Sequence, residues 1–129
     1  MSEPLWVLMR ALIVVHDRQI ARHGGAPGTR DLALLEMGCA RAMNLWAYRK
    51  APLHEIAAAY AFGIAKAHAF IDRNKRTAFV AAVTFLRLNG QQFRPEPVEG
   101  VRMMEDLAAG TVSEAEFAQW LRVGMSPLA

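Results

Sequence analysis

Two alanine-rich apolar segments, residues 52–67 and 75–88, lie on either side of a short polar run in the middle of the chain. When the segments are read with the 3.6-residue period of a helix, apolar residues occupy almost every face of both. Pro52 suits the first turn of a helix, and the pair Asn89-Gly90 suits the end of one, because both of these residues accept a left-handed backbone. The pattern predicts two buried central helices that pack closely through their alanines, with a polar loop between them.

Amphipathic segments on both sides of this pair predict further helices. The periodicity predicts a first helix over about residues 4–22, with His16 on its apolar stripe as a core histidine. Asp31 can cap a second helix, another follows residue 97 and stops at Gly110, and Ser113 with Glu116 forms a capping box for a last short helix. Residues 91–93 are predicted to be extended, and the proline near the end predicts a frayed tail. We expect an all-α bundle of about six helices in which residues 1–129 form a single domain.

Charge and cysteine content narrow the possible partners and compartments. The net charge of +3 suits an anionic ligand but is too small to predict a coat of nucleic acid. The one cysteine, Cys39, excludes an internal disulfide and lies among apolar helix formers, so we expect a buried filler. The sequence shows no basic signal region, and its charge-free apolar runs are too short to cross a bilayer, which predicts a cytoplasmic protein.

The polar run between the central helices reads His68-Ala69-Phe70-Ile71-Asp72-Arg73-Asn74-Lys75-Arg76. A lone histidine at the end of an apolar helix is more often structural, but the nearby cations disfavour a protonated ring, so a neutral His68 could accept a hydroxyl proton. Asp72 could cap the following helix. Alternatively, Asn74 could cap it and leave Asp72 on the loop, free to bind Mg²⁺ together with nucleotide phosphates. The residues alone leave both alternatives open.

Three cations, Arg73, Lys75 and Arg76, fall at the predicted start of the second central helix. Positive charge in a first turn is slightly unfavourable because the helix dipole is already positive there. An anion bound among the cations would remove this misfit. Their placement therefore favours bound phosphate over an ordinary solvated face.

The polar run resembles the signature of the Fic/Doc family, and its form His-x-Phe-x-Asp-x-Asn-Lys-Arg is similar to that of the Doc, or death-on-curing, branch. Residues 16–20, 24–31, 34–36 and 85–90 also resemble Doc-type sequence in the same order, so the resemblance covers nearly the whole chain. It implies a compact all-helical fold whose motif loop joins two central helices.

The resemblance also implies a role for each residue of the loop. His68 becomes the general base that deprotonates an acceptor hydroxyl, and Asp72 becomes the Mg²⁺ ligand. Asn74, Lys75 and Arg76 become the groups that hold the phosphates of ATP. Arg73 stands where relatives mostly carry a small residue, so its extra cation either helps to hold phosphate or crowds the loop. Phe70 becomes a buried anchor.

The activity implied is that of a toxin from a toxin–antitoxin module. Relatives with glycine at the position of Lys75 transfer AMP to a protein hydroxyl. In Doc-like members, the resemblance implies, the lysine reorients ATP so that its γ-phosphate faces the acceptor, which makes the toxin a protein kinase. The implied target is a threonine of elongation factor Tu, whose modification stops translation. The implied partner is a Phd-like antitoxin whose C-terminal helix folds into a surface groove.

Other interpretations remain beside this one. AMP transfer is the nearest alternative, although the further arginine of AMP-transferring relatives would fall at Phe79. A non-catalytic corepressor that works through its antitoxin is an alternative of another class. Residues 44–51 lie where the family has a flap that aligns the target peptide, although Trp46 could simply pack into the core.

Overall fold

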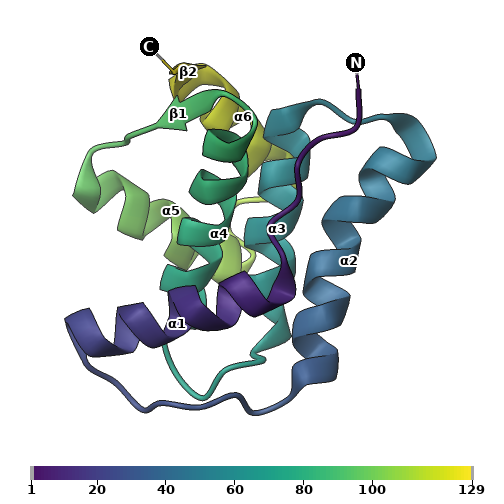
Figure 1. The fold of residues 1–129 in the computed structure, drawn as a ribbon. Coiled ribbons are helices and arrows are strands. Elements are labelled where there is room, and N and C mark those ends of the chain that lie inside the picture. The colour runs from purple at the N-terminus through teal and green to yellow at the C-terminus, as the bar shows by residue number, and fades with distance from the viewer. Residues whose placement is uncertain (1, 129) are drawn as a thin grey trace.

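The computed structural model describes residues 2–128, which form a bundle of six helices and one short two-stranded sheet (Figure 1). The helices are α1 (Met9–His23), α2 (Leu32–Arg49), α3 (Leu53–Ala67), α4 (Asn74–Leu88), α5 (Pro97–Ala109) and α6 (Glu114–Gly124). The strands are β1 (Gln91–Phe93) and β2 (Met125–Pro127), which pair antiparallel. The predicted all-α class is confirmed, with the motif loop between the two central helices.

Helix α3 forms the centre of the bundle and packs against α2, α4 and α6. Alanine occupies many of its buried positions, namely residues 57, 58, 59, 61 and 65. Because alanine adds little volume, neighbouring helices approach the backbone of α3 closely. The close packing of the central pair, predicted from the alanines, is confirmed.

The first helix begins later than predicted, at Met9 rather than near Pro4. Residues 4–8 are extended and run along the core, which Figure 1 shows as the purple segment leading down to α1. The Asn89 side chain binds both the N–H and the carbonyl of Leu5, at 2.8 and 2.9 Å. The Tyr60 hydroxyl accepts from Val7 N–H at 3.2 Å. These tertiary bonds replace the helical ones, which the apolar pattern could not reveal.

Helix α2 continues through the residues that were predicted to interrupt the pattern. It ends at Arg49, and Lys50 closes it in a left-handed conformation with φ 51°. Trp46 is buried in the core, and the Lys50 ammonium lies 4.9 Å from the centre of its indole. Of the two interpretations of this segment, core packing by Trp46 is the one that the structure supports, and an interrupting flap at residues 44–51 is wrong.

The C-terminal segment is a strand rather than the predicted frayed tail. Met125, Ser126 and Pro127 pair with Phe93, Gln92 and Gln91. Pro127 is tolerated because β2 is an edge strand, and Leu128 N–H instead donates to Gly90 O at 2.9 Å. The predicted capping box of α6 is confirmed, since Ser113 and Glu116 each bind the other's backbone N–H.

Within residues 2–128, no helix combines the length and the apolar character that crossing a bilayer requires. The predicted burial of Cys39 is confirmed. Burial is the main cause that raises the pKa of its thiol to about 11, and the nearby Glu36 carboxylate adds to the effect.

Candidate functional site

The motif loop spans residues 68–73 and turns the chain from α3 into α4. His68 follows the last residue of α3 with φ 51°, and Arg73 precedes the first residue of α4 with φ 62°. Both residues therefore hold left-handed conformations that are uncommon outside glycine. Such backbone conformations persist only where surrounding contacts fix them, and they concentrate at functional sites.

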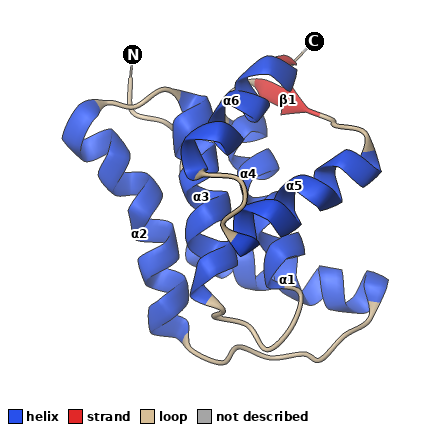
Figure 2. Ribbon diagram, turned by 180° about the vertical axis from the view of Figure 1, so that it is seen from behind, coloured by secondary structure: helices blue, strands red, loops and turns tan. Residues whose placement is uncertain are grey.

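The segment that connects α1 to α2 lies along this loop and fixes it. Arg30 and Asp31 donate their N–H groups to Ala69 O at 2.7 and 3.0 Å, and Ile71 N–H donates to Gly28 O at 3.2 Å. Thr29 and Phe70 form an isolated antiparallel bridge between the two segments. Seen from behind in Figure 2, both loops run beneath the ends of the central helices. The segment beside the motif is thus residues 24–31, not the predicted residues 44–51.

Phe70 and Asn74 hold the loop from inside. The Phe70 ring is buried, as predicted for the anchor of the motif. The Asn74 amide bridges the turn, since its Oδ1 accepts from Phe70 N–H at 3.1 Å and its Nδ2 donates to Phe70 O at 2.9 Å. Asn74 is the first residue of α4, so its side chain braces the loop and does not cap the helix. The prediction that Asn74 binds phosphate stays a prediction.

Asp72 lies on the loop with its carboxylate exposed to solvent. Its Oδ1 accepts from Arg73 N–H at 2.8 Å, and its Oδ2 accepts from Ala26 N–H at 3.2 Å. These two backbone bonds, the first above all, hold the pKa of Asp72 below its usual value, with the Arg73 and His16 charges adding less. Arg73 stands at the cap position of α4 without a capping side-chain bond, so the interpretation of Asp72 as the cap is wrong.

A pocket of about 890 Å³ opens between the motif loop, α1, α4 and α5. His68 and Asp72 line it together with five basic residues, namely Arg22, His23, Arg73, Lys75 and Arg76. Apolar side chains also line it, Phe79 and Val80 from α4 and Pro97, Val101 and Met104 from α5. The volume falls within the range of small-molecule sites, and its basic side suits an anion.

Lost solvation and the neighbouring basic residues lower the pKa of His23, which lines the pocket with them. The pKa of His23 lies below the ordinary histidine value, first because of lost solvation and then because of the Arg76, Arg22 and Arg73 guanidinium groups. His23 and Arg22 stand in the last turn of α1, where cations are favourable beside the free carbonyls. Neither residue was predicted from the sequence. The signal that could have indicated them as pocket residues is their position just before the glycine-rich turn at residues 24–28.

Like Asn74, two of the three cations predicted to hold phosphate already have protein partners. Arg73 donates from Nε to Gly24 O at 2.9 Å and from Nη2 to His23 O at 2.8 Å, so its guanidinium ties the loop to the end of α1. Arg76 donates from Nε to Gln19 Oε1 at 2.8 Å. Lys75 is exposed on the first turn of α4 and lines the pocket. Phosphate binding by these three cations stays a prediction.

Within residues 2–128, no cluster of three or more histidine, cysteine or acidic side chains could enclose a metal ion. Two exposed carboxylates line the basic pocket, Asp72 on the motif loop and Glu105 on α5. This donor set fits Mg²⁺, which keeps several waters and is commonly held by one or two carboxylates plus substrate phosphates. The residues therefore fit a metal that arrives with a nucleotide, and the ligand role of Asp72 stays a prediction.

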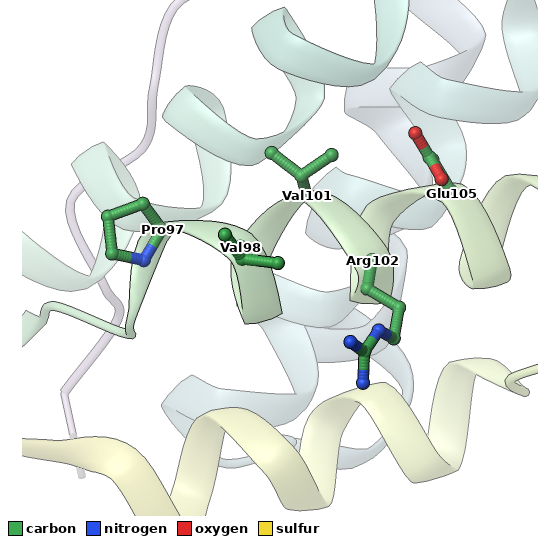
Figure 3. Close-up of a pocket in the computed structure, with 5 residues that line it drawn as sticks. All are labelled: Pro97, Val98, Val101, Arg102 and Glu105. Atoms are coloured by element: carbon green, nitrogen blue, oxygen red, sulfur yellow. The ribbon is translucent and has the colours of Figure 1, made fainter.

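A second, shallower hollow of about 390 Å³ lies on α5 and is lined by Pro97, Val98, Val101, Arg102 and Glu105 (Figure 3). The hollow lacks His68, Asp72 and the cations of α4. Pro97, Val101 and Glu105 line both cavities, so α5 separates the basic pocket from this apolar surface. The chemistry of the motif belongs to the larger pocket.

Comparison with known proteins agrees with the fold and the loop. Residues 6–86 match the Fic/DOC family, and the chain belongs to this family. It is 38% identical over 112 residues to "Protein kinase doc" of Escherichia phage P1, an alignment that covers 86% of this chain and 88% of the relative. It is also 42% identical over 73 residues to "Toxin Doc" of Mycolicibacterium smegmatis, covering 54% of this chain and 55% of the relative.

Proposed function

We propose that this protein is a Doc-type toxin that acts as an ATP-dependent protein kinase. The observation that carries the proposal is that His68, Asp72 and the first-turn cations of α4 line one pocket. Phosphoryl transfer depends mainly on positioning and charge neutralisation, and this set of groups supplies both. The relatives named as a kinase and as a toxin support the same function.

Each group would have a defined part in the transfer. The His68 imidazole would accept the proton of the acceptor hydroxyl while the new oxygen–phosphorus bond forms. The bond from the γ-phosphorus to the bridging oxygen would break, and ADP would leave. Lys75, Arg76 and the free N–H groups of the first turn of α4 would hold phosphate oxygens. Bound Mg²⁺, with Asp72 as a ligand, would neutralise charge on the phosphates.

AMP transfer is the second candidate, and the position of Phe79 argues against it. The family resemblance places the further arginine of AMP-transferring relatives at this position. Phe79 instead packs on the apolar side of the pocket, with its ring centre 6.5 Å from that of Phe93. An aromatic ring cannot replace the charge-assisted bonds of a guanidinium to phosphate. Lys75, where such relatives carry glycine, favours phosphoryl transfer for the same family reason.

The proposed acceptor is a threonine hydroxyl of a translation factor, with elongation factor Tu as the first candidate. Purified protein should be incubated with elongation factor Tu, ATP and Mg²⁺, and the factor analysed by intact-mass spectrometry. We expect a phosphate-sized increment that is lost with His68→Ala. An adenylate-sized increment would replace the kinase proposal with AMP transfer, and no increment on this factor or in a cell extract would contradict both.

Expression in a bacterial host tests the toxin part of the proposal. The wild-type chain should arrest growth, and His68→Ala should not, because only the proton acceptor is removed. Arrest by both chains would contradict catalysis and would favour action through binding alone. Absence of arrest by the folded wild-type chain would contradict the toxin assignment.

A Phd-like antitoxin is the proposed partner, and the exposed apolar side chains of α5 support it. Val98 and Val101 are exposed and flank the hollow shown in Figure 3, with Arg102 and Glu105 beside them. An amphipathic helix could cover such a surface with its apolar face and bind the charged rim with polar side chains. Because α5 also forms one wall of the basic pocket, a helix bound here would lie next to the nucleotide site.

A further inference from the structure

His16 lies buried beneath the motif loop, and its ring is fixed by two contacts. Its Nε2 is 2.8 Å from the carbonyl oxygen of Asp72. Its ring stacks on Phe70, with centroids 3.9 Å apart and planes at 6°. A carbonyl oxygen only accepts, so Nε2 carries the hydrogen and donates it. The side chain is 1% exposed, so water cannot easily replace this donor.

The bond from His16 sets the orientation of the peptide that joins Asp72 to Arg73. In a trans peptide the C=O and N–H groups point in opposite directions, so fixing the carbonyl toward His16 directs the N–H away from it. That N–H is the donor to Asp72 Oδ1 at 2.8 Å. Arg73 has φ 62°, which a non-glycine residue adopts only when other contacts hold it. The His16 bond is such a contact.

The second carboxylate oxygen is held from the same part of the chain. Asp72 Oδ2 accepts from Ala26 N–H, three residues beyond the end of α1, the helix that carries His16. Gly25 leaves the space for this contact, because a Cβ atom there would lie 2.8 Å from Oδ2. Helix α1 and the turn after it therefore orient both oxygens of a side chain that lies 56 positions after His16.

We propose that His16 is a positioning residue for the Mg²⁺ ligand: by donating to the Asp72 carbonyl, it fixes the Asp72–Arg73 peptide and so aims the carboxylate at the pocket. The inference rests on the proposed function, since it concerns how the metal ligand of that site is held. His16 itself does not line the pocket. Groups that orient metal ligands through such bonds typically change metal affinity about 10–100-fold when they are lost.

Two substitutions separate the hydrogen bond from the packing of the ring. His16→Phe keeps an aromatic ring for stacking on Phe70 but lacks the donor. His16→Gln lacks the ring but can place an amide N–H near the position of Nε2. Titration calorimetry would measure ATP affinity with and without Mg²⁺ for each purified chain. We expect His16→Phe to reduce the gain in affinity from Mg²⁺ by about tenfold, with Mg²⁺-free ATP binding unchanged, and His16→Gln to restore most of the gain.

Tyr60→Phe is the matched control. It also removes a buried hydrogen-bonding group, the hydroxyl that binds Val7 N–H and O, but at a place away from the motif loop. The control should be less stable than wild type and should keep the full Mg²⁺ gain. An equal loss of the gain in Tyr60→Phe, or an unchanged gain in a folded His16→Phe, would overturn the proposal.

Amide hydrogen exchange provides a readout that needs neither nucleotide nor activity. The Arg73 and Ala26 amides, which bind the Asp72 oxygens, should exchange faster in His16→Phe than in wild type, relative to core amides, and should not do so in Tyr60→Phe. If His16→Phe does not fold, ¹⁵N shifts of the wild-type ring must show the Nε2–H tautomer, and the Nδ1–H tautomer would overturn the proposal. If wild type shows no Mg²⁺-dependent ATP binding, the proposed function fails while these two measurements still decide the role of His16.

Discussion

Gly38 on α2 and Gly63 on α3 face each other where the two helices cross, so closely that a Cβ atom on Gly63 would lie 2.6 Å from the carbonyl oxygen of Gly38. The obstructing atom belongs to a helix backbone and cannot rotate away. Elsewhere in the chain a helical glycine has ordinary space, since a Cβ on Gly100 would meet Pro95 at 3.5 Å and Phe79 at 3.9 Å. An added methyl group should therefore affect stability differently at Gly63 and at Gly100.

Gly63→Ala should destabilise the fold by about 1–3 kcal/mol, the usual effect of excess volume in a packed core. Gly100→Ala should have the opposite sign and stabilise by roughly 0.5–1 kcal/mol, because alanine loses less backbone entropy in a helix. Urea unfolding of both variants against wild type measures the two changes. Equal effects of the two substitutions would mean that α2 and α3 are not in backbone contact at Gly63.

Lys75→Ala should weaken ATP binding by about 10–100-fold, as expected for the loss of a charged hydrogen bond of roughly 1.5–3 kcal/mol. The side chain is exposed on the first turn of α4 and lines the basic pocket, so the fold should not change. Arg87→Ala, in the last turn of the same helix, is the matched control and should bind ATP as wild type does. Calorimetry gives both constants, and equal affinity of Lys75→Ala and wild type would place the phosphates elsewhere.

Glu96 predicts a specific pH dependence of stability. Its carboxylate caps α5 by accepting from Val98 and Glu99 N–H, and these bonds, the first above all, lower its pKa below the ordinary value of 4.5. A lowered folded-state pKa means that the stabilisation is present above about pH 4.5 and is lost as pH falls through the folded-state value. The difference in unfolding free energy between wild type and Glu96→Gln should therefore shrink between pH 6 and pH 3. A difference that grows on acidification would contradict this sign.

Cys39 should be almost inert in the folded protein. With a pKa of about 11, roughly one thiol in a thousand is ionised at pH 8, against about one in ten at the ordinary value of 9.0. Burial of the side chain adds a steric barrier. Labelling with a thiol reagent should accelerate sharply when urea unfolds the chain, in step with loss of helical circular dichroism. Rapid labelling in native buffer would show that α2 opens locally around Cys39.

Val101→Asp should weaken binding of an antitoxin C-terminal peptide by about tenfold or more, because a charge would replace an apolar side chain worth roughly 1.5–3 kcal/mol when covered. Val123→Asp on α6 introduces the same charge on a valine that is also exposed and serves as the control. Fluorescence anisotropy with a labelled peptide gives both affinities. Equal weakening by the two substitutions would indicate a general charge effect rather than a site on α5.

The elements that the sequence predicted well are those whose signals are local. The capping box of Ser113, the stop at Gly110 and the cap at Asp31 each depend on a few neighbouring residues, and all three are present. The start of α1 was predicted too early because Asn89, far along the chain, holds Leu5 extended. The tail was predicted to fray because its strand partner lies more than thirty positions earlier, at residues 91–93.

In the candidate site, too, the local features were predicted and the contacts between distant residues were not. Order along the chain was enough to group His68, Asp72 and the following cations, and the structure brings them to one pocket. Order could not reveal that Arg73 binds the carbonyls of His23 and Gly24, or that Asn74 is engaged with Phe70. His16 was correctly expected in the core, but its partner is a backbone carbonyl, which no residue type encodes.

The crowding around α3 has a consequence for the residue that follows it. Because the backbones of α2 and α3 meet at Gly38 and Gly63, with no flexible side chain between them, α3 has one rotational setting about its axis, and this setting fixes the position of His68 at its end. One extra residue inserted upstream in α3 would rotate the end of the helix by about 100° and advance it by about 1.5 Å. His68 would then leave the pocket although every residue of the motif is unchanged. The rotation of α3 is thus as much a part of the proposed site as the motif residues themselves.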